Sequence, residues 1–428
     1  MDDKTVLYEY WIVFGDYVRI ARMQMFRSIQ HSMVQVDLGA VNHNCRIIRA
    51  HIGEQCQLCA VVKADGYGLG ATKVASQLGE HAELLAVYSP DEAGELLVSG
   101  VTTPILVLSP VHSVDRFHPM YHGLTRGDVQ LVVHGVSHLE SIIQLAKRIG
   151  RSLPVQVKVD TGLHRGGCGL QEATSLIEMI RSHQMLELKG VMTHFISAVH
   201  DEELTRVQHN RFNHILQSLS SPLPDDCLLH EANTAGTVQW KWTHRNMVRV
   251  GLAWTGAVPV GVAPLQDILP VVTWRTRLAH LKCVKSHEQV GYSGKWTATR
   301  PSRIGIVPVG YAAGYPMGVG AEGDSEGAFV RVYDEQFKNV YGDAPVIGSV
   351  CMDQIAIDLT DIPDCGIAHG IELISSNEQS KATLTSLSAV AGVVPHAIIS
   401  RISSKVHRTY LEVQPTTNTS NQKQNVSI

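Results

Sequence analysis

Between residues 34 and 260, short apolar runs alternate with stretches in which apolar residues recur at helical spacing. The apolar runs are VQVDL (34–38), LCAVVK (58–63), LLAVY (84–88), PILVLS (104–109), LVVHG (131–135) and VQVKVD (155–160). Helical spacing is clearest in LGAVNHNCRIIRAHI (38–52) and HLESIIQLAKRIG (138–150). About eight strand–helix units of this length favour a closed, parallel (β/α)8 barrel over an open sheet.

After residue 265 the pattern changes to strands separated by turns, and a helical pattern returns only at 384–403. We therefore predict an α/β protein in which an N-terminal (β/α)8 barrel precedes a mainly β C-terminal domain. The predicted divisions are an N-terminal extension without assigned function (1–32), the barrel (33–264), the β-rich domain (265–413) and a disordered polar tail (414–428).

The composition favours a protein whose ligand or substrate is a small molecule. The 428 residues carry a formal net charge of −4, so no basic field favours nucleic acid. No apolar run reaches the roughly 18 residues that a membrane span requires. The apolar stretch at 6–14 follows Asp2 and Asp3, whereas a secretory signal carries positive charge at that point. We expect a cytoplasmic protein that binds neither nucleic acid nor membrane.

The cysteines support the same setting. The 8 cysteines are scattered through the chain, which is not the pattern of a secreted disulfide scaffold. Cys56 and Cys59 form a CQLC motif, but no second pair follows at zinc-ribbon spacing. We therefore expect reduced cysteines and no metal site.

Several predicted strands end in polar residues, beginning with Lys63 in AVVKADGYGLG, the first polar side chain after a buried run. In a barrel the carboxyl ends of the strands meet at one mouth, where reactive groups lie. Polar residues at or near other strand ends are Lys158 and Arg165 in VKVDTGLHRGGCG, His194 in VMTHF, and Asn233 and Thr234 in HEANTAG. In MVRVGLAWTG, Arg249 stands ahead of Gly251 and Leu252. Each has a structural alternative, such as a salt-bridged lysine, a core histidine or a helix N-cap. Their convergence favours a site.

These motifs, together with GYSGKWTA, VPVGYAAGYP and GSVCMDQIAID, resemble those of the alanine racemases, in the same order. The resemblance spans about 34–412 and implies a barrel that binds pyridoxal 5'-phosphate (PLP), followed by a β domain. It also implies a head-to-tail homodimer in which each active site includes residues of the partner subunit. The implied activity interconverts L-alanine and D-alanine and supplies D-alanine for peptidoglycan.

Racemisation exchanges a proton on both faces of a planar Cα, so the reaction requires two bases on opposite sides. By resemblance, Lys63 carries PLP and serves one face, while Tyr292 of the partner subunit serves the other. His194, with positive charge beyond it, would favour the phenolate form of that tyrosine. Arg249 would face the pyridine nitrogen; because a guanidinium cannot accept a proton, the ring would be a weaker electron sink and transamination would be suppressed.

The resemblance assigns the remaining site residues as well. Binding of PLP is implied for Lys63, Tyr67, Arg165, His194, Asn233, Thr234, Arg249, Gly251 and Leu252, and binding of the substrate for Arg165, Met352 and Tyr311. Tyr67, Thr234 and the N–H groups of Gly251 and Leu252 would hold the phosphate. Lys158 matches a lysine that is often carbamylated and that orients the arginine matched by Arg165.

The chain departs from the family pattern at Ala313, where aspartate is usual, and at Trp254, where tyrosine is usual. Ser404 and His407 replace a tyrosine that reaches the PLP phosphate and a proline. Loss of that tyrosine would weaken PLP binding by about ten- to a hundredfold. It could also leave room for serine as a substrate. An alanine/serine racemase, an amino-acid decarboxylase with this barrel and a non-catalytic PLP-binding protein therefore remain alternatives.

Overall fold

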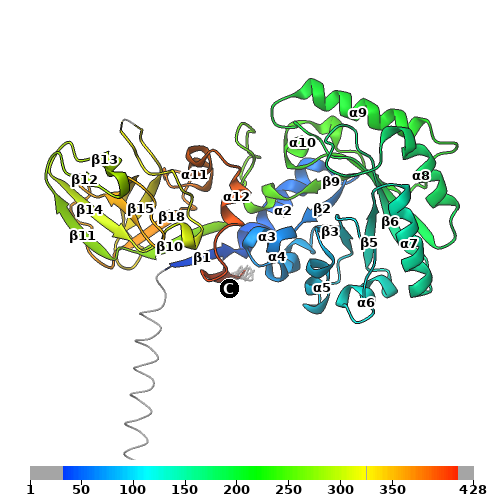
Figure 1. Ribbon diagram of the computed structural model, residues 1–428, viewed down its shortest axis with the longest axis horizontal. Helices are drawn as coiled ribbons and strands as arrows, with labels where there is room; N and C mark the ends of the chain where they lie inside the picture. The colour runs from blue at the N-terminus through cyan, green and yellow to red at the C-terminus, as the bar shows by residue number, and fades with distance from the viewer. Residues whose placement is uncertain (1–31, 324, 413–428) are drawn as a thin grey trace, which may run out of the picture.

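The structure, a computed structural model, describes residues 32–323 and 325–412. The expected N-terminal extension, apart from Ser32, and the expected tail lie outside these residues. Two domains lie side by side, the barrel and a β-rich second domain (Figure 1). None of the helices in the described part of the chain has the length and apolar character that a bilayer-spanning helix requires.

The first domain is the predicted parallel barrel, with 8 strands in the order β8-β7-β6-β5-β4-β3-β2-β9. The strands are β2 (Gln57–Val61), β3 (Leu84–Val87), β4 (Ile105–Val107), β5 (Val129–Val133), β6 (Leu153–Lys158), β7 (Leu186–Met192), β8 (Leu228–His230) and β9 (Met247–Val250). β9 pairs in parallel with β2. Between β8 and β9, the Arg249 N–H donates to the Ala232 carbonyl oxygen at 3.1 Å, which nearly closes the ring.

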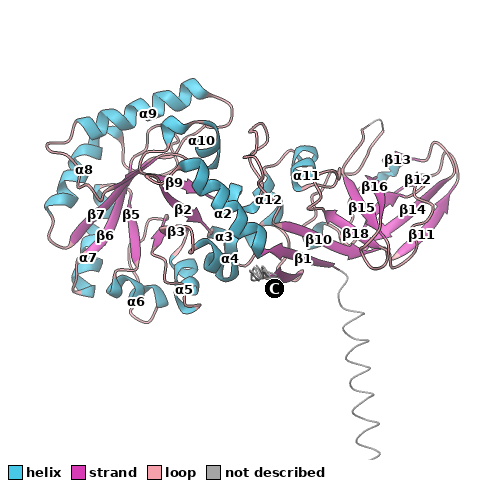
Figure 2. Cartoon of the chain, turned by 180° about the vertical axis from the view of Figure 1, so that it is seen from behind, coloured by secondary structure: helices cyan, strands magenta, loops and turns pink. Residues whose placement is uncertain are grey.

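Helices cover the outside of the barrel (Figure 2). They are α2 (Leu38–Ile52), α4 (Ala71–Leu78), α5 (Pro90–Val98), α6 (Pro119–Arg126), α7 (Val136–Ile149), α8 (Leu170–Ser182), α9 (Glu202–Gln217) and α10 (Thr234–Gln239), with the short turn α3 (Lys63–Gly68) at the mouth. In α7 the apolar spacing has the expected result, because Leu139, Ile142 and Leu145 are all buried.

The second domain is mainly β, as predicted. Its 9-stranded sheet has the order β11-β14-β17-β16-β15-β18-β10-β1-β19. The strands are β1 (Ser32–Asp37), β10 (Val272–Arg277), β11 (His280–Val284), β14 (Ser302–Val307), β15 (Phe329–Tyr333), β16 (Val340–Ile347), β17 (Ile355–Asp358), β18 (Gly370–Ile374) and β19 (His407–Leu411). A separate hairpin joins β12 (Gln289–Val290) to β13 (Trp296–Thr297).

The first strand differs from its expected place. The run at 34–38 forms β1, but β1 pairs with β10 and β19 of the second domain rather than with a barrel strand. Its residues alternate, with Val34 and Val36 buried and Gln35 half-buried. This period of two is typical of a sheet with one covered face, whereas parallel barrel strands are apolar on both faces. The described part of the chain therefore begins in the second domain and enters the barrel through α2.

The helical pattern at 384–403 forms α11 (Leu384–Ala391) and α12 (Pro395–Ile399). The second of these packs against α3, the turn that begins at Lys63. A Cβ added at Gly68 would lie only 2.8 Å from the carbonyl oxygen of Ile399. The C-terminal part of the chain is thus fitted closely against the barrel mouth.

Trp254, a departure from the family pattern, is a buried packing residue, as its sequence position suggested. Its indole Nε1–H donates to the Val61 carbonyl oxygen at 3.0 Å, at the end of β2. We predict that Trp254→Phe lowers the free energy of unfolding by about 1–3 kcal/mol, since a hydrogen bond and packed volume are both lost. Thermal unfolding measures this, with half-buried Trp296→Phe as the control. An equal or larger loss in the control would contradict the prediction.

Candidate active site

Lys63 begins a turn with an unusual backbone. Ala64, Asp65 and Tyr67 all have φ between +53° and +59°, the left-handed helical region. For residues other than glycine this region costs about 1–2 kcal/mol per residue. Such strain is typical of functional sites. In the sequence, the glycines of ADGYGLG are the sole direct sign of this strain.

Specific hydrogen bonds hold this turn. The Ala64 N–H donates to Glu92 Oε1 at 2.7 Å, and the Ala71 N–H donates to Asp65 Oδ1 at 2.7 Å. The other oxygen of Glu92 accepts the N–H of Ser89 at the start of α5. Glu92, which takes part in the cap of α5, therefore also fixes the backbone from which the Lys63 side chain projects.

Positive charge gathers around Lys63. Burial and the Arg165 guanidinium lower the pKa of Lys63, and Glu92 offsets this in part. Burial lowers the pKa of Lys158 to about 8, and the charges of Arg165 and Arg249 add to the effect. The structure thus brings the predicted cations of three strand ends and their loops to one mouth.

Arg249 is buried in β9, where acceptors from neighbouring strands fix its guanidinium. Nη2 donates to the Thr193 carbonyl oxygen at 2.6 Å and to His194 Nδ1 at 3.2 Å, and Nη1 donates to His230 Nδ1 at 2.8 Å. Nε makes no hydrogen bond to the described residues. Burial lowers the pKa of Arg249 to about 10, so the side chain remains charged at neutral pH.

His194 is a neutral imidazole with a defined tautomer. Burial, followed by the charge of Arg249, holds the pKa of His194 well below its usual range. Because an arginine only donates, Nδ1 of His194 must accept the bond from Arg249. The single proton of the ring therefore lies on Nε2, which is available as a donor.

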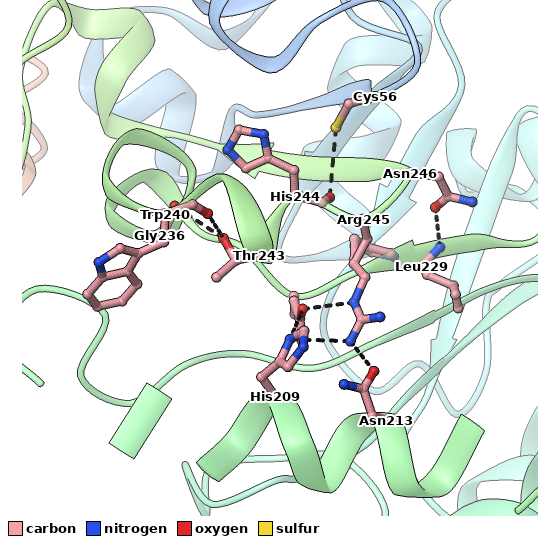
Figure 3. Close-up of polar contacts among 12 residues, drawn as sticks. Cys56, His209, Asn213, Leu229, Gly236, Trp240, Thr243, His244, Arg245 and Asn246 are labelled. Carbon is pink, nitrogen blue, oxygen red and sulfur yellow. Dashed lines mark hydrogen bonds and ion pairs between the residues drawn. The ribbon is translucent and has the colours of Figure 1, made fainter. Parts of the chain in front are cut away.

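A network of partly buried side chains around the buried carboxylate of Glu231 holds the segment that leads into β9 (Figure 3). Arg245 contacts Asn213 of α9 and donates from Nε to Glu231 Oε1 at 2.8 Å. His209 Nδ1 lies 2.6 Å from the same carboxylate oxygen. Sequence reasoning missed this network, because Glu231 lies between two residues of a motif but faces away from the mouth. The network fixes the backbone position of the segment that precedes Arg249.

Thr234 and the start of the segment after β9 form a small polar cup, in which the backbone N–H groups are bonded to the Thr234 hydroxyl. Thr234 Oγ1 accepts the N–H groups of Gly251 and Leu252, each at 3.2 Å. A Cβ at Gly251 would collide with the Tyr67 hydroxyl, so glycine is required there. The structure thus brings together all four residues expected around a phosphate.

Asn233 lies at the same strand end but acts as the N-cap of α10. Its Oδ1 accepts the Gly236 N–H at 3.0 Å. The N-cap, considered from the sequence as an alternative role for Thr234, is thus Asn233, and a direct role of Asn233 toward a cofactor remains a prediction.

Tyr292, Tyr311 and Met352 lie on the second domain, away from Lys63 of the same chain. Tyr292 is 72% exposed and Met352 is 55% exposed. The Ser349 hydroxyl donates to the Tyr292 carbonyl oxygen at 3.3 Å. The turn at Tyr311 is bonded to the Cys351–Met352 segment. Strands β12 and β13, which flank Tyr292 in the sequence, lie at the end of the second domain that is farther from the barrel (Figure 1).

Two family models match the chain. Residues 36–259 match the alanine racemase N-terminal domain and residues 271–410 match the alanine racemase C-terminal domain. The chain belongs to the alanine racemase family.

Similar proteins cover nearly the same length. The alanine racemase of Halothermothrix orenii is 32% identical over 387 residues, which are 90% of this chain and 98% of the relative. That of Mycobacterium bovis is 31% identical over 386 residues, 89% of this chain and 96% of the relative. The crystal structure of alanine racemase from Streptomyces lavendulae has a TM-score of 0.78 at 26% identity, covering 90% of this chain and 98% of that one.

The alanine racemase family is PLP-dependent, and the residues at the mouth fit that cofactor. Lys63 offers an amine whose pKa is lowered, and Arg249 offers an uncommitted Nε. The Tyr67 hydroxyl lies directly against Gly251, where a Cβ would collide with it, so the phenol stands beside the N–H groups at this strand end. The nearby carboxylate of Asp160 already accepts the N–H groups of its own loop, so the cations remain available for an anionic ligand.

One residue at this site was missed by sequence reasoning. The imidazole of His396, from α12, lies with its centroid 5.8 Å from that of the Tyr67 ring. Ser404, at the position where the family pattern has a phosphate-binding tyrosine, is exposed in the loop before β19. No spacing signal connects a histidine in α12 to Tyr67 of the barrel, because only the docking of the two domains joins them.

We predict that Gly251→Ala weakens PLP binding at least tenfold, because the new Cβ displaces the Tyr67 hydroxyl from the phosphate cup. Titration with PLP, followed by absorbance, measures the dissociation constant. Gly169→Ala is the control, since a Cβ there meets only the Gln171 side chain at 3.5 Å. Unchanged PLP affinity in Gly251→Ala would show that Tyr67 and Gly251 do not form the cup.

Proposed function

We propose that this protein is a PLP-dependent alanine racemase that interconverts L-alanine and D-alanine and supplies D-alanine for peptidoglycan. Bound PLP would supply the conjugated ring that takes up the electron pair when the Cα proton leaves. The observation that carries the proposal is Arg249, whose Nη atoms are held by the barrel, so that its Nε would donate to the pyridine nitrogen. A donor that cannot accept a proton favours racemisation over transamination.

Lys63 would hold PLP and move the proton on one face of Cα. A base acts best when its pKa lies near the working pH. Burial and Arg165 shift the pKa of Lys63 in that direction. The left-handed turn fixes the backbone position at Lys63, so its amine would approach the substrate Cα from a single side.

Tyr292 of the partner subunit would move the proton on the opposite face. Within one chain this phenol is exposed and remote from the mouth, so a second copy is needed to bring it to Lys63. An ordinary phenol titrates near about 10, so its ionised form must be stabilised. The Nε2–H of His194, backed by Arg249, is a suitable donor to that phenolate.

The same dimer would complete the substrate pocket. Tyr292, Met317 and Met352 expose apolar surface on the second domain, which favours contact with another chain. Met352 and Tyr311 of the partner subunit would line the pocket, with the backbone of Met352 and the guanidinium of Arg165 near the substrate carboxylate. Lys158, often carbamylated in the family, would orient Arg165.

The alternatives have weaker support. The case for serine rested on room left by Ser404, but Ser404 is exposed and His396 lies against Tyr67 instead. A decarboxylase of this barrel type would need neither Arg249 over the ring nor Tyr292. A non-catalytic PLP carrier would have no use for a second base.

Solvent deuterium incorporation into alanine tests the two-base proposal. We expect wild-type protein to exchange the Cα proton of both isomers in D2O. Tyr292→Phe should lower exchange by about 10²–10⁴-fold from L-alanine, and far less from D-alanine, since Lys63 still serves the other face. Tyr341→Phe, at a partly exposed tyrosine in the same domain, should exchange both isomers normally. Equal losses from both isomers would contradict the assignment of faces.

A further inference from the structure

His396 reaches the cofactor site from the second domain. Its ring centroid is 5.8 Å from that of Tyr67, which lines the phosphate cup. Its Nδ1 is buried and has no hydrogen-bond partner among the described residues. A buried polar atom without a partner is costly, and in native proteins it usually indicates a ligand, an ion or a water.

We propose that His396 is a further hydrogen-bond donor to the phosphate group of PLP, contributed by the second domain of the same chain. The proposal rests on the PLP dependence set out under Proposed function. It extends the cup formed by Tyr67, Thr234 and the N–H groups of Gly251 and Leu252.

Electrostatics support a donor at this place. Burial, and then the positive charge of Lys63, lower the pKa of His396. The ring is therefore a neutral imidazole when no anion lies beside it, with one N–H to offer. A bound phosphate would provide the missing acceptor and would also offset the charge of Lys63.

Contacts at Gly68 hold α12, and with it the imidazole, against the turn that carries Lys63. Gly68 of α3 leaves no room for a Cβ against the Ile399 carbonyl oxygen. Arg408 of β19 donates from Nε to the Gly68 carbonyl oxygen at 3.1 Å. The turn that carries Lys63, the helix that carries His396 and the last strand are therefore held together, so His396 cannot withdraw without disturbing Lys63.

Equilibrium dialysis of the holoenzyme against graded PLP concentrations tests the proposal. His396→Leu should raise the dissociation constant about ten- to a hundredfold, because a hydrogen bond to a charged group is lost. His396→Asn keeps an N–H donor and should recover most of the affinity. Ser404→Ala and His407→Ala, at exposed positions in the same C-terminal segment, should bind PLP as wild type does.

Pyridoxal, which lacks the phosphate, separates a specific contact from general damage. His396→Leu should bind pyridoxal as well as wild type does, and the ³¹P NMR signal of bound PLP should shift in His396→Leu but not in Ser404→Ala. Wild-type affinity for PLP in His396→Leu, or equal losses for PLP and pyridoxal, would overturn the proposal. A wild-type protein that binds no PLP would instead refute the proposed function.

Discussion

The crowding of positive charge at the barrel mouth is the constraint on which the rest of the site depends. Burial lowers the pKa of Lys63, Lys158 and Arg249, and the charge of Arg165 lowers all three further; Arg249 and Lys63 also lower the pKa of Lys158. Like charges so close together lower the pKa of amines and favour bound anions. The arrangement therefore serves two purposes at once. It prepares Lys63 as a base, and it attracts a cofactor phosphate and a substrate carboxylate.

The protein maintains this arrangement with rigid supports as well as with the nearby carboxylates of Glu92 and Asp160. Backbone carbonyl oxygens and neutral histidines hold Arg249, and Glu92 holds the strained turn at Lys63. Helix α12 of the second domain packs against that turn. The second domain thus contributes to the site of its own chain through His396 and, in the proposed dimer, to the site of the partner through Tyr292.

Local features could be predicted from the sequence, whereas features that depend on docking could not. The barrel followed from repeated strand–helix units, and the convergence of Lys63, His194 and Arg249 followed from their places at strand ends. The left-handed turn is a local feature that was not predictable, since Ala64 and Tyr67 disfavour positive φ. The role of His396 was missed because it lies far from Tyr67 in the sequence. Only the docking of the second domain against the barrel brings the two rings together. The alternation of Val34 and Val36 did carry the sign that β1 belongs to the second domain.

The most direct measurement is to locate the lysine that carries the cofactor, since Lys63 and Lys158 share the mouth and both have a lowered pKa. The protein would be loaded with PLP, reduced with sodium borohydride, digested, and its pyridoxyl-labelled peptide identified by mass spectrometry. We predict one label per chain, on Lys63, and none in Lys63→Arg. A label on Lys158, or retention of the label in Lys63→Arg, would contradict the account.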